Sequence, residues 1–525
     1  MIPPQDDSTA KLRRIVYTFL IVSSAATMVG RIMSVESRSG KTAMLSANDR
    51  SRWCTIRALV DHGTYEIDSV IKRKTDWYTI DMVRHKGADA REHYYSSKPP
   101  LLPTLLAGQY WLLKNLAGVT LADNPFYIAR IVLVLSNVLP LVLYFVVLGW
   151  CVESLGTNDW SRLFVMTCAT WGTFLTTFAV TLNNHLPGAI GVMLATYAAI
   201  QILHHGDLRG RWFAVAGFFG AFAVANELPA LALLAMLCAA LLWASPKKTA
   251  IAFAPAAAVV AIAFFSTTYI AHQSLRPPYA HRHDGKVVAT VRRPTGEITS
   301  ADAVQQIQME LSTTGIEIGS TATISPSIKP NRWVLWDSDQ SVRYALLPSD
   351  SGIEVREWDT WYEYEGSYWT PESKTGVDKG ESSRAAYAFH TLLGHSGVFS
   401  LTPIWLLSCV GIGLWLKQGS HSLQAFSLMV LTLTIVCITF YIMRPEKDRN
   451  YGGVSCGFRW LFWLTPLWLV AMLPATDAVA KHRRWKIVAM GLLGMSVFSA
   501  TYAAMNPWSH SWIFDYWTHL EWIAY

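Results

Sequence analysis

Apolar runs long enough to cross a bilayer recur along most of this 525-residue chain. A helix rises about 1.5 Å per residue, so roughly 20 residues are needed to cross about 30 Å of hydrocarbon. Only 15% of the residues are charged, which suits a chain that lies largely in lipid. The expected fold is an all-α polytopic membrane protein with about 11 transmembrane helices, at residues 15–29, 128–150, 161–181, 187–203, 212–226, 228–244, 250–270, 398–416, 422–443, 460–474 and 486–504.

Positive charges between the runs predict which side of the membrane each loop faces. Arg13 and Arg14 precede the first run, which places the N-terminus in the cytoplasm. A cleaved signal peptide would show the same pattern of basic residues before an apolar run, but the many later apolar runs favour a first span that is not cleaved. The net charge of +7 is explained by this topology and not by nucleic-acid binding. Alternate threading keeps the other basic clusters in the cytoplasm as well: Arg209, Arg211, Lys247, Lys248, Lys417, Lys481, Arg483 and Arg484.

The same threading divides the chain into three parts. Residues 1–270 form a transmembrane core that includes a first extracytoplasmic loop at 31–127. Residues 271–397 form an extracytoplasmic lobe, in which alternating stretches at 286–291 and 332–336 predict β-strands and hence a small α+β fold. Residues 398–525 supply the C-terminal transmembrane helices and an extracytoplasmic tail.

The first outer loop gathers an acid and two bases near the membrane. Asp49 and Arg52 are three residues apart, so on a helix both side chains project from one face. Lys98 precedes two prolines and an apolar, amphipathic stretch at residues 105–116. This stretch predicts a helix that lies in the membrane interface. The alternative interpretations are an ordinary surface ion pair for Asp49 and Arg52, and a snorkelling lysine for Lys98.

These motifs resemble those of the GT-C class of membrane glycosyltransferases, in particular bacterial lipid A aminoarabinose transferases and protein mannosyltransferases. The resemblance rests on Asp49, on Arg52 three residues later, and on the sequence Lys-Pro-Pro-Leu from Lys98 before an interfacial helix. It covers residues 10–270 in motif order and hydropathy. It implies an outward-facing cavity in which a polyprenyl-phosphate sugar is the donor, and inverting transfer to an acceptor hydroxyl.

By position, the resemblance implies that Asp49 is the general base and that Arg52 and Lys98 bind the donor phosphate. The chemistry agrees, because the acceptor must lose a proton while negative charge grows on the departing phosphate. Many relatives have a second acidic residue after the aspartate, where this chain has Arg50. No cofactor is therefore expected, and a divalent metal is not indicated.

The expected partners and location follow from that donor. An undecaprenyl-phosphate sugar implies the plasma (inner) membrane of a bacterium, with a multi-pass enzyme whose site faces the periplasm. The acceptor is left open as a lipid, a glycan or a protein, and the sugar is not specified.

Further substrate contacts are expected at Tyr94, Tyr95, His185, Glu227, Arg449 and Arg459. His185 is a candidate for acceptor binding or for a capping or headgroup contact. Glu227, at a break between two apolar runs, is a candidate for acceptor binding or for an ion pair. The glycine-rich loop from Arg449 to Arg459 suits a pyrophosphate or lipid headgroup, or is a plain basic turn.

Two further pairs carry weaker signals. His281 and His283 have a His-x-His spacing that suits zinc, but no third ligand is evident. Cys54 and Cys456 both fall in predicted outer loops, where a disulfide between them would be stable.

Two other functions are alternatives to sugar transfer of this type. An O-antigen polymerase or ligase also uses polyprenyl-linked sugars and commonly places its key residues late in the chain, which would draw attention to Arg449 and Arg459. A lipid-linked sugar transporter or flippase would need polar residues lining its membrane helices, and the apolar runs here carry few.

Overall fold

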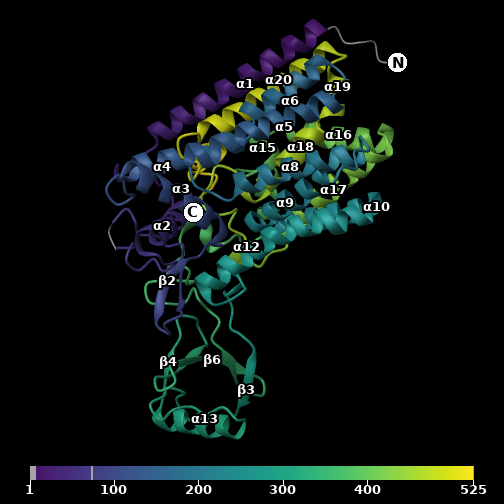
Figure 1. Cartoon of the computed structure of the whole chain (residues 1–525). Coiled ribbons are helices and arrows are strands. Elements are labelled where there is room, and N and C mark those ends of the chain that lie inside the picture. The colour runs from purple at the N-terminus through teal and green to yellow at the C-terminus, as the bar shows by residue number, and fades with distance from the viewer. Residues whose placement is uncertain (1–6, 73–74, 524–525) are drawn as a thin grey trace.

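The computed structural model describes residues 7–72 and 75–523, which form a bundle of helices and a separate sheet-containing lobe (Figure 1). Within that part of the chain, six helical segments are long and apolar enough to cross a membrane, or seven if a pair bent by 45° is counted as one span. The chain is therefore a multi-pass membrane protein. The segments are Ser8–Ser34, Pro125–Leu155, Asp159–Val180, His185–Leu203, Pro246–His272 and His421–Ile442, and the bent pair is Arg459–Ala471 with Leu473–Val479.

The expected count of about 11 spans is not confirmed, because several of the apolar runs form shorter helices. Helix α9 (Gly210–Asn226) has 17 residues, and α10 (Leu231–Ala244) and α16 (Trp405–Gln418) have 14 each. A 14-residue helix is only about 21 Å long, less than the hydrocarbon thickness. Helix α20 (Arg483–Tyr502) has 20 residues, but its first turn is strongly basic.

Helix α1 (Asp7–Ser34) is tied to the bundle at the end that the basic residues predict to be cytoplasmic. Arg13 pairs with Glu153, at the end of α5 (Leu139–Leu155), and with Asp159, at the start of α6 (Asp159–Trp171), both at 2.7 Å. Figure 1 shows this end of α1 far from the sheet-containing lobe. The other elements of the first half are α4 (Pro125–Leu133), η1 (Val134–Val138), α7 (Phe174–Thr177), η2 (Phe178–Val180), α8 (His185–Leu203), η3 (Leu228–Ala230), α11 (Pro246–Lys248), η4 (Thr249–Phe253) and α12 (Ala254–His272).

The first loop folds against the opposite end of the bundle. It contains α2 (Ala47–His62), the antiparallel strands β1 (Met82–Lys86) and β2 (Glu92–Ser96), and α3 (Leu101–Ala117). Helix α3 buries Tyr110 and leaves Trp111 and Leu116 exposed, at 55% and 84%. This amphipathic division confirms the expected helix after Lys98 and suits the membrane interface.

The lobe is a five-stranded antiparallel sheet with one helix. The strands are β3 (Val287–Val291), β4 (Thr323–Pro326), β5 (Trp333–Asp337), β6 (Val342–Ser349) and β7 (Gly352–Glu357), in the order β3-β7-β6-β5-β4. Helix α13 (Ala301–Thr313) buries Ile307 and Leu311 against it. Strands β3 and β5 confirm the two predicted from sequence, and Figure 1 shows the lobe projecting away from the bundle.

The last part of the chain returns to the base of the lobe before it completes the bundle. After α17 (His421–Ile442), the backbone carbonyl of Arg449 accepts a hydrogen bond from Glu381 N at 2.9 Å. The side chain of Asn450 donates to Asp378 at 3.1 Å. The remaining elements are η5 (Pro278–Ala280), η6 (Gly376–Lys379), α14 (Arg384–Leu392), α15 (Val398–Leu401), η7 (Glu446–Asp448), η8 (Arg459–Leu464), α18 (Thr465–Ala471), α19 (Leu473–Val479) and α21 (Trp512–His519).

The disulfide considered between Cys54 and Cys456 is not formed. Both thiols are free and buried, and the Sγ atom of Cys54 donates to the carbonyl of Trp77 at 3.3 Å. Burial raises the pKa of both thiols, so each behaves as a small apolar side chain.

Candidate functional site

A cavity of about 1140 Å³ lies where the first loop, the helices and the base of the lobe meet. Its polar lining includes Arg52, Asp81 and Lys98 from the first loop, Glu227 from the break between α9 and α10, and Arg459 from the start of η8. With Arg50, Arg282, Arg444, Asp378 and Asp448, which also line it, the cavity has six cationic side chains and four carboxylates. It is the natural candidate for the site, since a large pocket with converging charged groups is the usual form of one.

The Asp49 carboxylate lies outside that lining, at the first turn of α2. Ser46 caps the helix with its side chain accepting from Asp49 N at 3.1 Å, and the Asp49 carboxylate accepts from Ser46 N at 3.0 Å. The same carboxylate accepts from Leu45 N at 2.9 Å and from Thr181 Oγ1 at 2.7 Å. This is a capping box, in which the acid starts the helix.

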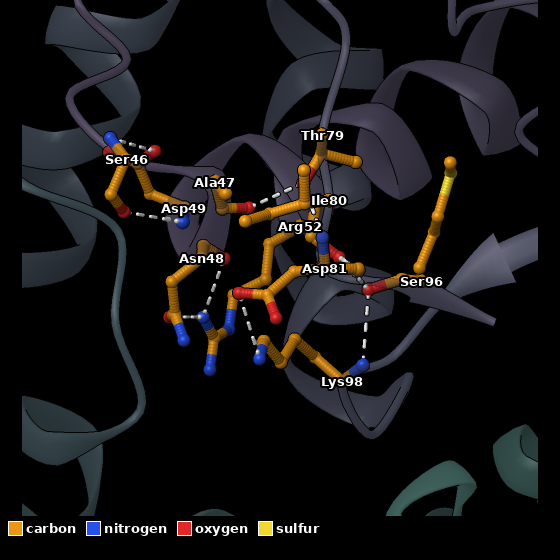
Figure 2. Close-up of polar contacts among 12 residues, drawn as sticks. Ser46, Ala47, Asn48, Asp49, Arg52, Thr79, Ile80, Asp81, Ser96 and Lys98 are labelled. Atoms are coloured by element: carbon orange, nitrogen blue, oxygen red, sulfur yellow. Dashed lines mark hydrogen bonds and ion pairs between the residues drawn. The ribbon is translucent and has the colours of Figure 1, made fainter. Parts of the chain in front are cut away.

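Asp49 is fully buried, and burial raises its pKa while these hydrogen bonds oppose the rise. Figure 2 shows its carboxylate pointing toward Ser46, whereas the side chains of Arg52, Asp81 and Lys98 point toward one another. No ion pair joins Asp49 to Arg52 within the described residues, although both were expected on one face of the helix. Asp49 is thus not bonded to either cation, although its charge is near enough to oppose the lowering of the pKa of Arg52 by burial.

Arg52 is held in the cavity by neutral partners. Its Nη1 donates to the carbonyl of Asn48 at 3.0 Å and to the Asn48 side chain, and its Nη2 donates to Asn184 Oδ1 at 2.6 Å. The side chain is 3% exposed, and burial lowers the pKa of Arg52 to about 10, an effect that the charge of Asp81 opposes. Among the residues that the structure describes, no carboxylate is bonded to this guanidinium, which neutral partners hold in place.

Lys98 does have a carboxylate partner, and it is Asp81. The two groups are 3.1 Å apart, and Figure 2 shows the lysine side chain reaching to the aspartate. Burial lowers the pKa of Lys98 to about 8, again opposed by Asp81. Asp81 is positioned by its backbone, whose carbonyl accepts from Ser51 Oγ of α2 at 2.5 Å and from Ser97 N at 3.1 Å.

Sequence reasoning missed Asp81, because its place depends on strand pairing. It directly precedes β1, and the register Met82↔Ser96 brings residue 81 opposite the segment that leads to Lys98. The turn-forming sequence at 87–90 between the strands was the signal that could have revealed this pairing.

The residues expected late in the chain divide between the cavity and the protein interior. Arg459 lines the cavity, and its Nη1 donates to His185 Nε2 at 2.8 Å. His185 in turn contacts Glu227 through Nδ1 at 2.5 Å, so the histidine, the glutamate and the arginine form one chain. Arg449 is buried and is not among the lining residues of the cavity.

Tyr94 and Tyr95 also lie away from the cavity lining. The ring of Tyr95 stacks on His85 at 4.2 Å, and its hydroxyl lies 3.4 Å from Glu66. The ring of Tyr94 packs edge-on against Tyr364 at 5.4 Å. Both tyrosines hold the β1–β2 hairpin against its neighbours.

The weak metal signal at His281 and His283 is not strengthened by the structure. His281 pairs with Asp359 and stacks on Trp361 with ring centroids 3.5 Å apart. Across residues 7–72 and 75–523, no group of three histidine, cysteine, aspartate or glutamate side chains is arranged to hold a metal ion.

Comparison with known proteins gives structural similarity and little sequence similarity. No family model matches the chain, and no curated protein matches it. Among solved structures, the S. cerevisiae protein O-mannosyltransferase Pmt1-Pmt2 complex bound to the sugar donor is similar at 12% identity and TM-score 0.48, over 97% of this chain and 92% of that one. Two structures of an Archaeoglobus fulgidus oligosaccharyltransferase are also similar.

The named neighbours are GT-C class membrane glycosyltransferases. The first oligosaccharyltransferase structure, in the apo form, is 12% identical at TM-score 0.40, and the second, AglB in complex with an inhibitory peptide and a dolichol-phosphate, is 10% identical at TM-score 0.41. Each comparison covers 94% of this chain, which spans only 56% of the oligosaccharyltransferase. What this chain does is argued below from its own residues.

Proposed function

We propose that the chain is a membrane glycosyltransferase that transfers a sugar from a polyprenyl-phosphate donor to an acceptor hydroxyl. The observation that carries this proposal is the meeting of Arg52, Lys98 and Arg459 around Asp81 in one cavity. The whole lining carries six cationic side chains and four carboxylates, so positive charge is in excess, and an anionic group such as a phosphate would balance it.

An apolar wall in the same cavity supports a donor with a lipid tail. Helix α10 contributes Leu231, and α17 contributes Val436 and Phe440. These three side chains line the cavity and are 50–57% exposed. In this proposal the polyprenyl chain lies along this apolar wall between α10 and α17 while its phosphate reaches the cations.

Asp81 is the general base in this proposal, in place of Asp49. The acceptor oxygen attacks the anomeric carbon, the bond from that carbon to the phosphate oxygen breaks, and the acceptor proton passes to the Asp81 carboxylate. The electron pair of the broken bond remains on the phosphate, where Arg52, Lys98 and Arg459 stabilise the added charge. A donor phosphate beside Lys98 also replaces Asp81 as the partner of the lysine ammonium group. The Asp81 carboxylate is then free to accept the proton.

The acceptor is placed on the lobe side of Asp81. Tyr362 and Trp369 line the cavity there, and the indole N–H of Trp369 donates to the carbonyl of Ile80 at 2.9 Å. This bond fixes an aromatic wall one residue from Asp81. Aromatic faces pack well against the apolar faces of sugar rings, which favours a glycan acceptor.

The cavity lies at the end of the bundle opposite the Arg13 cluster, which supports an extracytoplasmic site. In this proposal the enzyme resides in the plasma (inner) membrane and its cavity faces the periplasm. It needs no cofactor.

Asp81→Asn and Asp49→Asn together test the assignment. The purified protein in nanodiscs would receive polyprenyl-phosphate monosaccharides and lipid, glycan and peptide acceptors, with released polyprenyl phosphate as the readout. Loss of the base should lower the turnover of Asp81→Asn by about 10²- to 10⁴-fold, whereas folded Asp49→Asn should remain active. Full activity of Asp81→Asn, or loss confined to folded Asp49→Asn, would return the base to Asp49.

A further inference from the structure

Glu227 occupies a break in the membrane helices where a carboxylate is unexpected. It stands between α9 and η3 in an extended conformation (φ −132°, ψ 97°), is 5% exposed, and lines the cavity. Room for its side chain is made by Gly188 of α8, where an added Cβ would lie 2.8 Å from Glu227 Cγ. A buried carboxylate with a place reserved for it needs a structural or chemical reason.

One oxygen of this carboxylate receives two hydrogen bonds. Oε1 accepts from Asn184 Nδ2 at 2.7 Å and lies 2.5 Å from His185 Nδ1. These neighbouring residues at the start of α8 contact two different arginines. Asn184 contacts Arg52 at 2.6 Å, and His185 contacts Arg459 at 2.8 Å.

The donors and acceptors in both branches can be assigned without ambiguity. An arginine side chain only donates, so the atoms facing Arg52 and Arg459 must be the acceptors Asn184 Oδ1 and His185 Nε2. The remaining Nδ2 of Asn184 then donates to Glu227, and the neutral His185 carries its proton on Nδ1 and donates to Glu227 as well. The amide orientation and the imidazole tautomer are thus fixed between an arginine on one side and the Glu227 carboxylate on the other.

We propose that Glu227 is a positioning residue that presets both arginines for the donor phosphate, acting on Arg52 through Asn184 and on Arg459 through His185. This inference rests on the proposed function. Arg52 and Arg459 come from distant parts of the chain and repel each other in one cavity, an effect that contributes to the lowered pKa of Arg52. A single carboxylate behind them offsets that repulsion and keeps both guanidinium groups aimed inward before the donor arrives.

The test compares Glu227→Gln, Glu227→Ala and Gly188→Ala, with binding of undecaprenyl phosphate and steady-state transfer measured on the purified protein. Glutamine keeps an acceptor oxygen and should weaken binding less than tenfold. Alanine should weaken binding about 10- to 100-fold, as loss of an outer partner commonly does at preorganised sites. Gly188→Ala changes no charge but displaces the Glu227 side chain, so it should weaken binding about as much as Glu227→Ala does. The donor KM should rise while the acceptor KM stays constant, and Glu317→Gln, an exposed lobe glutamate, is the matched control.

Single-branch variants keep the test decisive if Glu227→Ala does not fold. Asn184→Leu interrupts only the route to Arg52, and His185→Phe only the route to Arg459. Each should weaken undecaprenyl phosphate binding, and combining either with Glu227→Gln should give less than the product of the separate effects, because the residues act in one chain.

Three results would overturn part of the account, and they are distinguishable. If Arg52→Ala weakens undecaprenyl phosphate binding but Glu227→Gln, Asn184→Leu and His185→Phe all leave it unchanged, the positioning role is wrong and the proposed function stands. If Arg52→Ala also leaves binding unchanged, the phosphate site itself is wrong. If Glu227→Gln keeps normal binding and loses turnover more than about 10³-fold, Glu227 handles the proton and is not a positioning residue.

Discussion

Lys98 should make donor binding depend on pH in the weakly alkaline range. Burial lowers the pKa of Lys98 to about 8, and the proposed phosphate contact needs the protonated ammonium. A sugar phosphodiester keeps its single negative charge across this range, so the donor does not contribute to the change. The sign follows directly: the contact is present below the pKa of Lys98 and is lost as pH rises through it.

The magnitude follows from the same pKa. Half of the lysines are protonated at pH 8 and about a tenth at pH 9, so apparent donor affinity should fall about five- to sixfold over this interval, or about 1 kcal/mol. Arginine stays charged throughout, so Lys98→Arg should bind with an affinity that is nearly constant over the interval.

In the assay, undecaprenyl phosphate is titrated at a series of pH values into the wild-type protein and into Lys98→Arg. The titration is repeated with the sugar-linked donor, because the free phosphate has a second ionisation and the sugar-linked phosphate does not. Binding of the sugar-linked donor should weaken above pH 8 in the wild type only. Identical profiles for the two proteins, or tighter wild-type binding at higher pH, would refute the reasoning that Lys98 meets the phosphate.

Four further predictions test other parts of the structure. Asp49→Ala should lower the stability of the fold by about 1–2 kcal/mol, seen as a lower Tm, because it removes the carboxylate half of the capping box and leaves the backbone N–H of Ser46 without its partner. Arg52→Lys should raise the donor KM about 10- to 100-fold, because an ammonium does not reproduce the fixed bonds to two asparagines. Gly411→Ala should also lower Tm, since its Cβ would lie 2.0 Å from the carbonyl of Ala471, and overpacking of this kind costs about 1–3 kcal/mol. All seven cysteines should react with maleimide after denaturation without reductant, and only five reacting would indicate a bridge between Cys54 and Cys456.

Local patterns in the sequence predicted the parts of the fold that depend on neighbouring residues. The prolines after Lys98 and the amphipathic run that follows predicted helix α3, and the carboxylate at Glu227 predicted the break between α9 and α10. Alternation at 286–291 and 332–336 gave two of the lobe strands. The count of about 11 spans is not confirmed, because apolar composition does not distinguish a full crossing from a helix of 14 residues.

Three features of the candidate site were not predicted from local sequence patterns. The three-residue spacing of Ser46 and Asp49 resembles a capping box, and that competing use of the acid was not recognised. Asp81 has no distinctive neighbours in the sequence, and it reaches Lys98 only because β1 and β2 pair. Arg459 meets His185, at the start of α8, through a tertiary contact that no local pattern encodes.

The most direct test of the central claim is an experimental structure of the protein with a bound polyprenyl phosphate. The account predicts the phosphate within hydrogen-bonding distance of Arg52, Lys98 and Arg459, with the polyprenyl chain leaving between α10 and α17. A phosphate bound away from these three side chains, or a lipid that enters elsewhere, would contradict it.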